Sequence, residues 1–291
     1  MKSDTKGMFV GFIGIFIFSL TLPATKIAIF DLDPYFIAYG RAVIAALAAG
    51  IYLMASKEKW IEAKYIPKLL IVAGGVVFGF PILANLAMEN GSSAHGAIIL
   101  GLLPLATAIL GVLRHHEKPS IGFWISAIIG SSLVVIFSFI SGDGKVAHED
   151  WLLLGACVFA SIGYSEGTDL SKVMHPKVVI SWVLVLSLPI SLILSYYTFE
   201  VSYLHMSLSS WAAFIYLALF SMYIGFFFWY EGLLIGGVAR VSQVQLLQPF
   251  CTMIAASLML GDELTVLNVI FATLVVLSVM IGKKMLIAKS N

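Results

Sequence analysis

Long apolar runs dominate the chain and constrain its fold more than any other feature. Each run holds about 20 residues with few charges, which is the length an α-helix needs to cross a bilayer. The runs follow one another with short connections. The sequence therefore predicts an all-α integral membrane protein with ten transmembrane helices, whose approximate limits are 7–30, 34–55, 67–88, 94–113, 120–140, 150–171, 176–197, 209–231, 237–259 and 264–287.

Composition agrees with this fold class and excludes several functions. Of the 291 residues 60% are hydrophobic and 11% charged, whereas about a quarter of the residues of a soluble domain are charged. A net charge of +1 gives no basic field for nucleic acid, so no nucleic-acid partner is expected. The two cysteines lack metal-ligand spacing, and no phosphate-binding loop or catalytic triad pattern occurs. We expect a protein that is not an enzyme and holds no metal or cofactor.

Basic residues indicate the orientation. With a cytoplasmic N-terminus, 14 of the 17 Lys and Arg residues fall on the inner side and only Lys145 on the outer side, while Lys26 and Arg41 lie inside helices. Basic residues accumulate on the cytoplasmic side of membrane proteins. The sequence thus predicts a multi-pass protein of the inner (cytoplasmic) membrane with both termini in the cytoplasm. The first apolar run has no convincing cleavage site and is expected to persist as a helix.

The chain repeats itself at an offset of 145 positions. The segment 89–120 aligns with 234–265, and the alignment pairs Gly91 with Gly236, Ala94 with Ala239, His95 with Arg240, Pro104 with Pro249 and Glu117 with Asp262. Five helices per half is an odd number, so the second half must enter the membrane upside down. We predict two inverted five-helix repeats, 1–145 and 146–291, around a central cavity near the midplane.

Several of these stretches also resemble a known family. "ATKIA", "YGRAVIAAL", the proline-centred fourth and ninth helices and the closing "GDELT" resemble the EamA-type transporters of the drug/metabolite transporter superfamily. The resemblance covers essentially the whole chain. It implies a ten-helix basket whose cavity is lined mainly by the first, third, fourth, sixth, eighth and ninth helices. It also implies secondary transport, often export, of amino acids and other small metabolites.

The chain departs from the family pattern in two places. The stretch "FSLTLPATK" lacks the tryptophan often found in the first helix, and "HHEKP" stands where an apolar-Gly-Glu end to the fourth helix is usual. These departures leave the substrate open.

Charged side chains inside the predicted helices are candidates for function, because each costs at least about 2.5 kcal/mol at a helix centre unless it is compensated. Lys26 and Arg41 would each suit a substrate carboxylate. The alternative is a structural pair with Glu89 or with Asp31 and Asp33, or a side chain that reaches to the interface. For Arg41 the structural alternative is favoured, because the second helix is peripheral in the family.

Glu166 and Asp169 lie three apart on one face of the sixth helix. Glu166 would bind a substrate ammonium or carry a coupled proton, since desolvation raises the pKa of a carboxyl group. The alternative is a structural pair with Lys172 or Arg240. Both interpretations stay open at the level of sequence.

Neutral polar and aromatic residues complete the candidate set. Gln248 precedes Pro249, whose ring leaves a carbonyl one turn earlier without a partner, and Gln245 shares its predicted face. His95 is either a structural group or a titrating switch. The candidate substrate-binding residues are Gln248, Gln245, Asn85, Glu166, Lys26, Tyr223, Tyr164 and His95.

The resulting functional prediction is a secondary transporter that works by alternating access. Its expected cargo is a small amphipathic metabolite, with amino acids first, and its expected direction is outward. A multidrug or quaternary-cation exporter is the alternative, and a membrane scaffold or enzyme a more remote one. The expected partners are a small-molecule substrate, the lipid bilayer and protons as the candidate coupling ion, in a monomer or homodimer.

Overall fold

The structure is a computed structural model that describes residues 3–91, 93–115, 118–141, 148–261, 266–284 and 287–288. The side chains of a few residues within these ranges, His95 among them, lie outside the description. The described residues are almost entirely helical. Besides the helices and their connections, the described residues include two two-residue strands, β1 and β2, which pair antiparallel (Lys118 with Ala288, Pro119 with Ile287).

The first half of the chain contains the elements up to α8. In order they are α1 (Ser3–Ser19), α2 (Thr21–Ala28), α3 (Pro34–Ala55), η1 (Ala63–Tyr65), α4 (Ile66–Val72), η2 (Ala73–Gly79), α5 (Phe80–Asn90), α6 (Ser93–Ile99), η3 (Leu100–Leu102), α7 (Leu103–His115), β1 (Lys118–Pro119) and α8 (Ile121–Ser141).

The second half contains the remaining elements. They are α9 (His148–Leu170), α10 (Pro176–Tyr197), η4 (Val201–His205), α11 (Leu208–Ile215), η5 (Tyr216–Ile224), α12 (Gly225–Gly236), α13 (Val238–Ser242), η6 (Gln243–Leu247), α14 (Gln248–Leu260), α15 (Val266–Lys284) and β2 (Ile287–Ala288).

Sequence signals at the helix starts explain why the long helices begin where they do. α3 begins with Pro34, and the carboxylate of Asp33 accepts hydrogen bonds from two backbone N–H groups of its first turn. α10 begins with Pro176, and the ring of His175 accepts one such bond. Proline is suited to the first helical position because a backbone N–H there would have no acceptor within the helix, so its absence costs nothing. The same start therefore recurs in both halves.

Irregular helical turns also recur. A 3₁₀ segment, η3 or η6, precedes Pro104 in the first half and Pro249 in the second, and the two segments end 145 positions apart. Proline removes one backbone hydrogen bond from a helix, which favours a local change of winding. π-helical turns likewise interrupt both α4–α5 and α11–α12, as η2 and η5.

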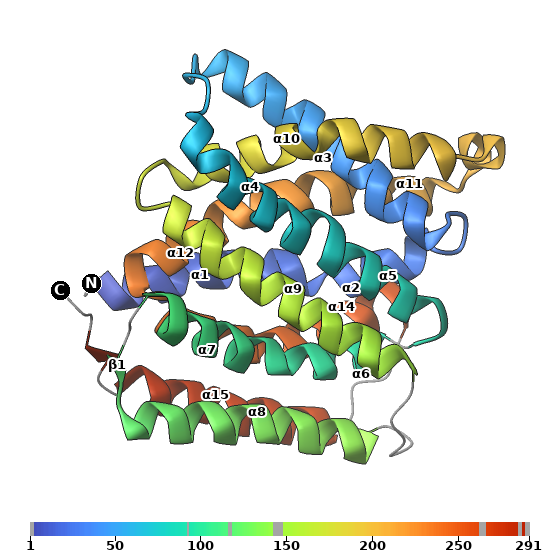
Figure 1. The fold of residues 1–291 in the computed structure, drawn as a ribbon. Helices are drawn as coiled ribbons and strands as arrows, with labels where there is room; N and C mark the ends of the chain where they lie inside the picture. Colours follow the sequence, from blue (N-terminus) through green and yellow to red (C-terminus); the bar gives the residue numbers. More distant parts are fainter. Residues whose placement is uncertain are drawn as a thin grey trace.

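Corresponding helices of the two halves make corresponding contacts. α1 runs along α12, and its counterpart α9 runs along α4, η2 and α5. α3 lies beside α10 at one face of the molecule and α8 beside α15 at the opposite face, with the other helices between them (Figure 1). Residues far apart in sequence therefore meet in the middle of the bundle.

Six helices of the described residues are long and apolar enough to cross a membrane. They are Thr5–Ala28, Pro34–Ala55, Ala63–Asn90, Pro176–Tyr197, Leu208–Gly236 and Val238–Leu260. The remaining segments have shorter apolar stretches or, like α9, carry acidic residues. The helical fold predicted from the sequence is confirmed, whereas the number of ten spans stays a prediction.

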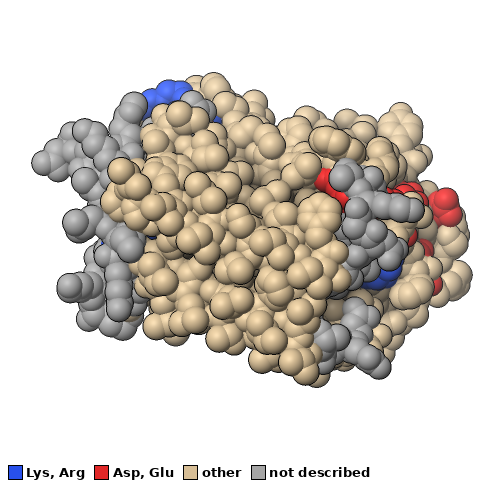
Figure 2. Space-filling model, turned by 90° about the horizontal axis from the view of Figure 1, so that it is seen from below, with Lys and Arg blue, Asp and Glu red and all other residues tan. Residues whose placement is uncertain are grey.

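The outer surface is suited to lipid. Figure 2 shows a broad face without charged side chains, bordered by acidic side chains gathered towards one end. α8 and α15 carry many exposed large apolar residues, among them Ile125, Ile129, Phe139, Val269, Ile270 and Leu277. Soluble monomers rarely expose apolar patches of this extent.

Candidate functional site

A narrow cavity lies in the middle of the bundle. Its lining comes from α1, α2, α3, η2, α5, η3, α7, α9, η5, α12 and α14, so both halves contribute. Its free volume is only ≈ 20 Å³, which is enough for about one water molecule. A metabolite would therefore fit only after the surrounding helices move apart.

One side of the cavity is aromatic. Phe18 of α1 and Tyr164 of α9 are stacked with ring centroids 6.5 Å apart. Phe226 of α12 lies edge-on to both, at 5.1 Å from Phe18 and 6.0 Å from Tyr164. Such rings hold one another in place and present a rigid apolar surface. This side is suited to the apolar part of a small molecule.

The cavity lining also contains polar side chains. Thr21 and Ser221 also line it, and their hydroxyl groups share a hydrogen bond of 2.8 Å. Gln248 reaches the cavity from the first turn of α14, next to Pro249. Hydroxyl and amide groups can both donate and accept hydrogen bonds, which suits a mixed polar ligand.

Arg41 is the charged member of the cavity lining. Its side chain is 2% exposed, and its Nε and Nη1 atoms have no hydrogen-bond partner among the described residues. Two of the three acidic partners suggested by the sequence are engaged elsewhere, because Asp33 caps α3 and Asp31 bonds to Ser207, and the third, Glu89, is exposed. The ion pair that was one of the structural alternatives for Arg41 is not seen among the described residues. A buried arginine of this kind costs about 2.5–3.5 kcal/mol at the centre of a membrane helix.

Of the eight residues named from the sequence, Gln248 and Tyr164 line the cavity. Tyr223 is buried outside the lining, where its hydroxyl shares a 2.8 Å hydrogen bond with Ser181. Glu166 is 5% exposed and is also outside the lining. The side chain of His95 lies outside the described residues.

Lys26 and Asn85 bind backbone carbonyl groups. The Nζ of Lys26 donates to the carbonyl oxygens of Met88 and Gly91, both at 3.0 Å. A lysine at this place satisfies the last carbonyls of α5 and suits the negative end of its dipole. The Nδ2 of Asn85 donates to the carbonyl oxygen of Pro34 at 3.0 Å. Both side chains thus connect neighbouring helices outside the cavity lining.

Gln245 lies on η6, which packs against α1, α7 and α15. It is 1% exposed, and neither its Oε1 nor its Nε2 has a hydrogen-bond partner among the described residues. Gln243 is buried in the same way, and its amide lies where a side chain at Gly282 would stand. Neither glutamine is part of the cavity lining.

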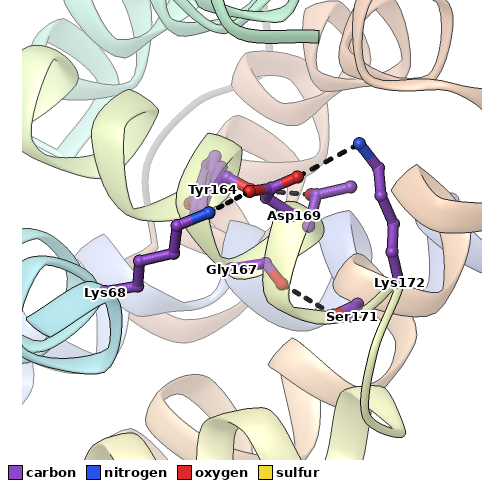
Figure 3. A network of polar contacts seen from close by, with 7 residues as sticks. Lys68, Tyr164, Gly167, Asp169, Ser171 and Lys172 are labelled. Atoms are coloured by element: carbon purple, nitrogen blue, oxygen red, sulfur yellow. Dashed lines mark hydrogen bonds and ion pairs between the residues drawn. The ribbon is translucent and has the colours of Figure 1, made fainter. Parts of the chain in front are cut away.

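At one end of the bundle, a carboxylate joins two helices. Asp169, near the end of α9, accepts from Lys68 of α4 and from Lys172, the latter at 3.2 Å. Figure 3 shows the two lysines reaching the carboxylate from opposite sides, with Ser171 bonded to the carbonyl of Gly167 close by. We call Lys68, Asp169 and Lys172 the Asp169 cluster. Its members are one third to one half exposed, so its energy in water would be small.

A second contact, which also joins the two halves, links the end of α2 to the start of α11. Asp31, just after α2, accepts from the N–H of Ser207 at 3.0 Å and from its hydroxyl at 2.7 Å, at the start of α11. Hydrogen bonds from Ser210 and Ser207 hold the pKa of Asp31 below its ordinary value. We call Asp31, Ser207 and Ser210 the Asp31 cluster. Along the chain, Asp31 of one cluster and Lys68 of the other lie on either side of α3, which has 22 residues and so spans about 33 Å at 1.5 Å per residue.

Comparison with known proteins identifies the family. The model of the EamA-like transporter family matches the chain twice, over residues 5–139 and 148–281. The chain belongs to the EamA-like transporter family. Together with the six apolar helices, this membership makes it a multi-pass membrane protein and a transporter.

Relatives of this EamA-like protein are also described as transporters. The uncharacterized transporter YdeK of Bacillus subtilis (strain 168) is 44% identical over 90% of this chain and 92% of its own. The uncharacterized transporter YyaM of the same organism is 28% identical over 83% and 81%. One solved crystal structure superposes with a TM-score of 0.77 at 18% identity, covering 96% of each chain. That likeness shows the fold alone.

Proposed function

We propose that this EamA-like protein is a secondary transporter that moves small amphipathic metabolites, amino acids first, out of the cell by alternating access. The central cavity carries this proposal, because it joins an aromatic side to hydrogen-bonding groups and is lined by both halves. Its small free volume corresponds to a state that must open before a molecule can enter. The Asp31 and Asp169 clusters are polar contacts between helix ends, and each could break when the cavity opens.

The membrane arrangement is part of the proposal. Ten spans would form two inverted repeats, 1–145 and 146–291, in the inner (cytoplasmic) membrane with both termini in the cytoplasm. Two observations support the inverted repeats: π-helical and 3₁₀ segments recur in both halves, and corresponding helices of the two halves make corresponding contacts. Protons are the proposed coupling ion, with Glu166 as their carrier, and the oligomer is a monomer or homodimer.

The proposed orientation predicts which loops meet which solution. In a variant whose native cysteines are replaced by serine, Ser202→Cys should react with a membrane-impermeant thiol reagent added outside intact cells. Glu62→Cys should react only after the membrane is opened. Both positions are exposed: Glu62 lies between α3 and η1, and Ser202 lies in η4 between α10 and α11. The reverse pattern at either position would refute the proposed orientation.

Flux measurements test transport itself. The full chain is reconstituted in liposomes and offered a panel of amino acids, other carboxylic acids, amines and quaternary ammonium compounds, with and without a proton gradient. The proposal requires flux of at least one panel member above empty liposomes. Flux confined to quaternary ammonium compounds would favour the cation exporter, and no flux for any compound would refute the proposed function.

Gln248→Leu should weaken the apparent affinity for the transported compound by about 5- to 150-fold. The substitution keeps the volume but removes hydrogen bonds worth roughly 1–3 kcal/mol. Gln243→Leu is the matched control: that amide is buried, has no hydrogen-bond partner in the described part of the chain and is outside the cavity lining, so its loss should leave affinity unchanged. Equal damage from both substitutions, measured as KM in liposomes, would exclude a binding role for Gln248.

A further inference from the structure

The charge of the cavity selects among possible cargoes. Arg41 is its only cation, and no Asp or Glu occurs among the described residues that line it. The guanidinium is buried, and two of its three nitrogens lack partners among the described residues. Arginine stays protonated in proteins. The cavity thus holds one positive charge and several unused donors.

We propose that Arg41 binds the carboxylate of the transported molecule and so restricts the cargo to compounds with one carboxylate group. This inference rests on the proposed function and names the chemistry of its site. A guanidinium presents paired N–H groups whose spacing matches the two oxygens of a carboxylate. A single arginine balances one carboxylate, whereas a phosphate ester would bring about two negative charges against one cation.

The remaining lining groups fit the rest of such a molecule. Gln248, Thr21 and Ser221 line the same cavity as Arg41 and offer both donors and acceptors. The rings of Phe18 and Tyr164 provide the apolar surface. An amphipathic carboxylate therefore finds a partner for each of its parts, while a quaternary cation would meet the positive charge of Arg41 with no acidic side chain in the lining to offset it.

The test compares wild type with Arg41→Met and Arg41→Lys. Purified full chain is heated with phenylalanine, leucine or phenylacetate at millimolar concentration, with the corresponding amides, and with phenyl phosphate as a phosphate ester. We expect the carboxylates to raise the Tm of the wild type and the amides to have much less effect. Arg41→Met should lose the carboxylate effect, with affinity reduced at least about tenfold, and Arg41→Lys should keep part of it. Lys64→Met, a change of an exposed lysine outside the cavity, should behave as wild type.

The stability of the ligand-free variant separates binding from folding. Because Nε and Nη1 of Arg41 have no hydrogen-bond partner among the described residues, Arg41→Met should fold and unfold at the same or a higher temperature than wild type. A lower Tm would show a structural role and overturn the inference. So would equal stabilisation by acids and amides, no stabilisation by any of the acids, or stronger stabilisation by phosphate esters. If liposomes transport neutral or cationic compounds and carboxylates equally well, the inference fails while the proposed function stands.

Discussion

Gly232→Leu is expected to prevent the protein from accumulating in the membrane, and Gly232→Ala to lower its thermal stability. A Cβ atom at this position would lie 2.6 Å from the backbone nitrogen of Gly11 and 2.7 Å from its Cα. Both are backbone atoms of α1, so they cannot move aside as a flexible side chain would. Helices α1 and α12 would have to separate.

The close approach depends on glycines from both helices. A Cβ at Gly7 would lie 2.6 Å from the nitrogen of Gly236, which makes the contact reciprocal. Small residues let membrane helices pack closely where apolar burial gives no driving force. Overpacking costs about 1–3 kcal/mol or more, which exceeds the gain of about 1 kcal/mol in helix propensity from glycine to alanine.

Gly74→Ala is the matched control for this prediction. It also lies in a helical segment, η2, but a Cβ there would meet no atom within 4 Å. The Tm of Gly74→Ala in detergent should equal or exceed that of wild type, while Gly7→Ala and Gly232→Ala should both fall below it. Equal effects at all three positions would show that the contact between α1 and α12 does not govern stability.

Local signals in the sequence predicted much of the helical fold. The prolines at 34 and 176 start helices, and those at 104 and 249 follow changes of winding. These effects act within a few residues, because proline fixes its own φ and lacks an N–H group. The family resemblance was also confirmed, because the residues that carry it lie in order along the whole chain.

Partner choice in three dimensions was harder to predict. Asp31 was a possible partner for Arg41, but it bonds to Ser207, 176 positions away in sequence. Lys26 was expected to bind a carboxylate or to reach the interface, but it binds two main-chain carbonyl groups at the end of α5. Main-chain carbonyls do not show in a sequence pattern, so such partners can be found only from the fold.

The cavity lining shows the same limit. Arg41 lies on α3, a helix expected to be peripheral, yet it reaches the cavity beside Ser221 and Thr21. Gln245 and Gln248 were predicted to share a face, but only Gln248 lines the cavity. η6, which carries Gln245, is enclosed by α1, α7 and α15. Helical spacing alone could not show that the neighbouring helices cover Gln245 but leave Gln248 facing the cavity.

The central claim is that the cavity is the transport path and opens to each side in turn. Ala160 tests it, because this fully buried residue of α9 lines the cavity near the middle of the helix. Val158, two positions earlier, is 55% exposed on the outer surface of the same helix and serves as the control. Each is replaced by cysteine in a chain whose Cys157 and Cys251 are serine.

The measurement adds a membrane-impermeant thiol reagent to right-side-out and to inside-out vesicles, and then records flux. Ala160→Cys should react from both sides, and its modification should stop transport, because the added group fills a cavity with little free volume. Val158→Cys should not react, since lipid surrounds it. Reaction of Ala160→Cys from one side only, or full flux after modification, would contradict alternating access through this cavity.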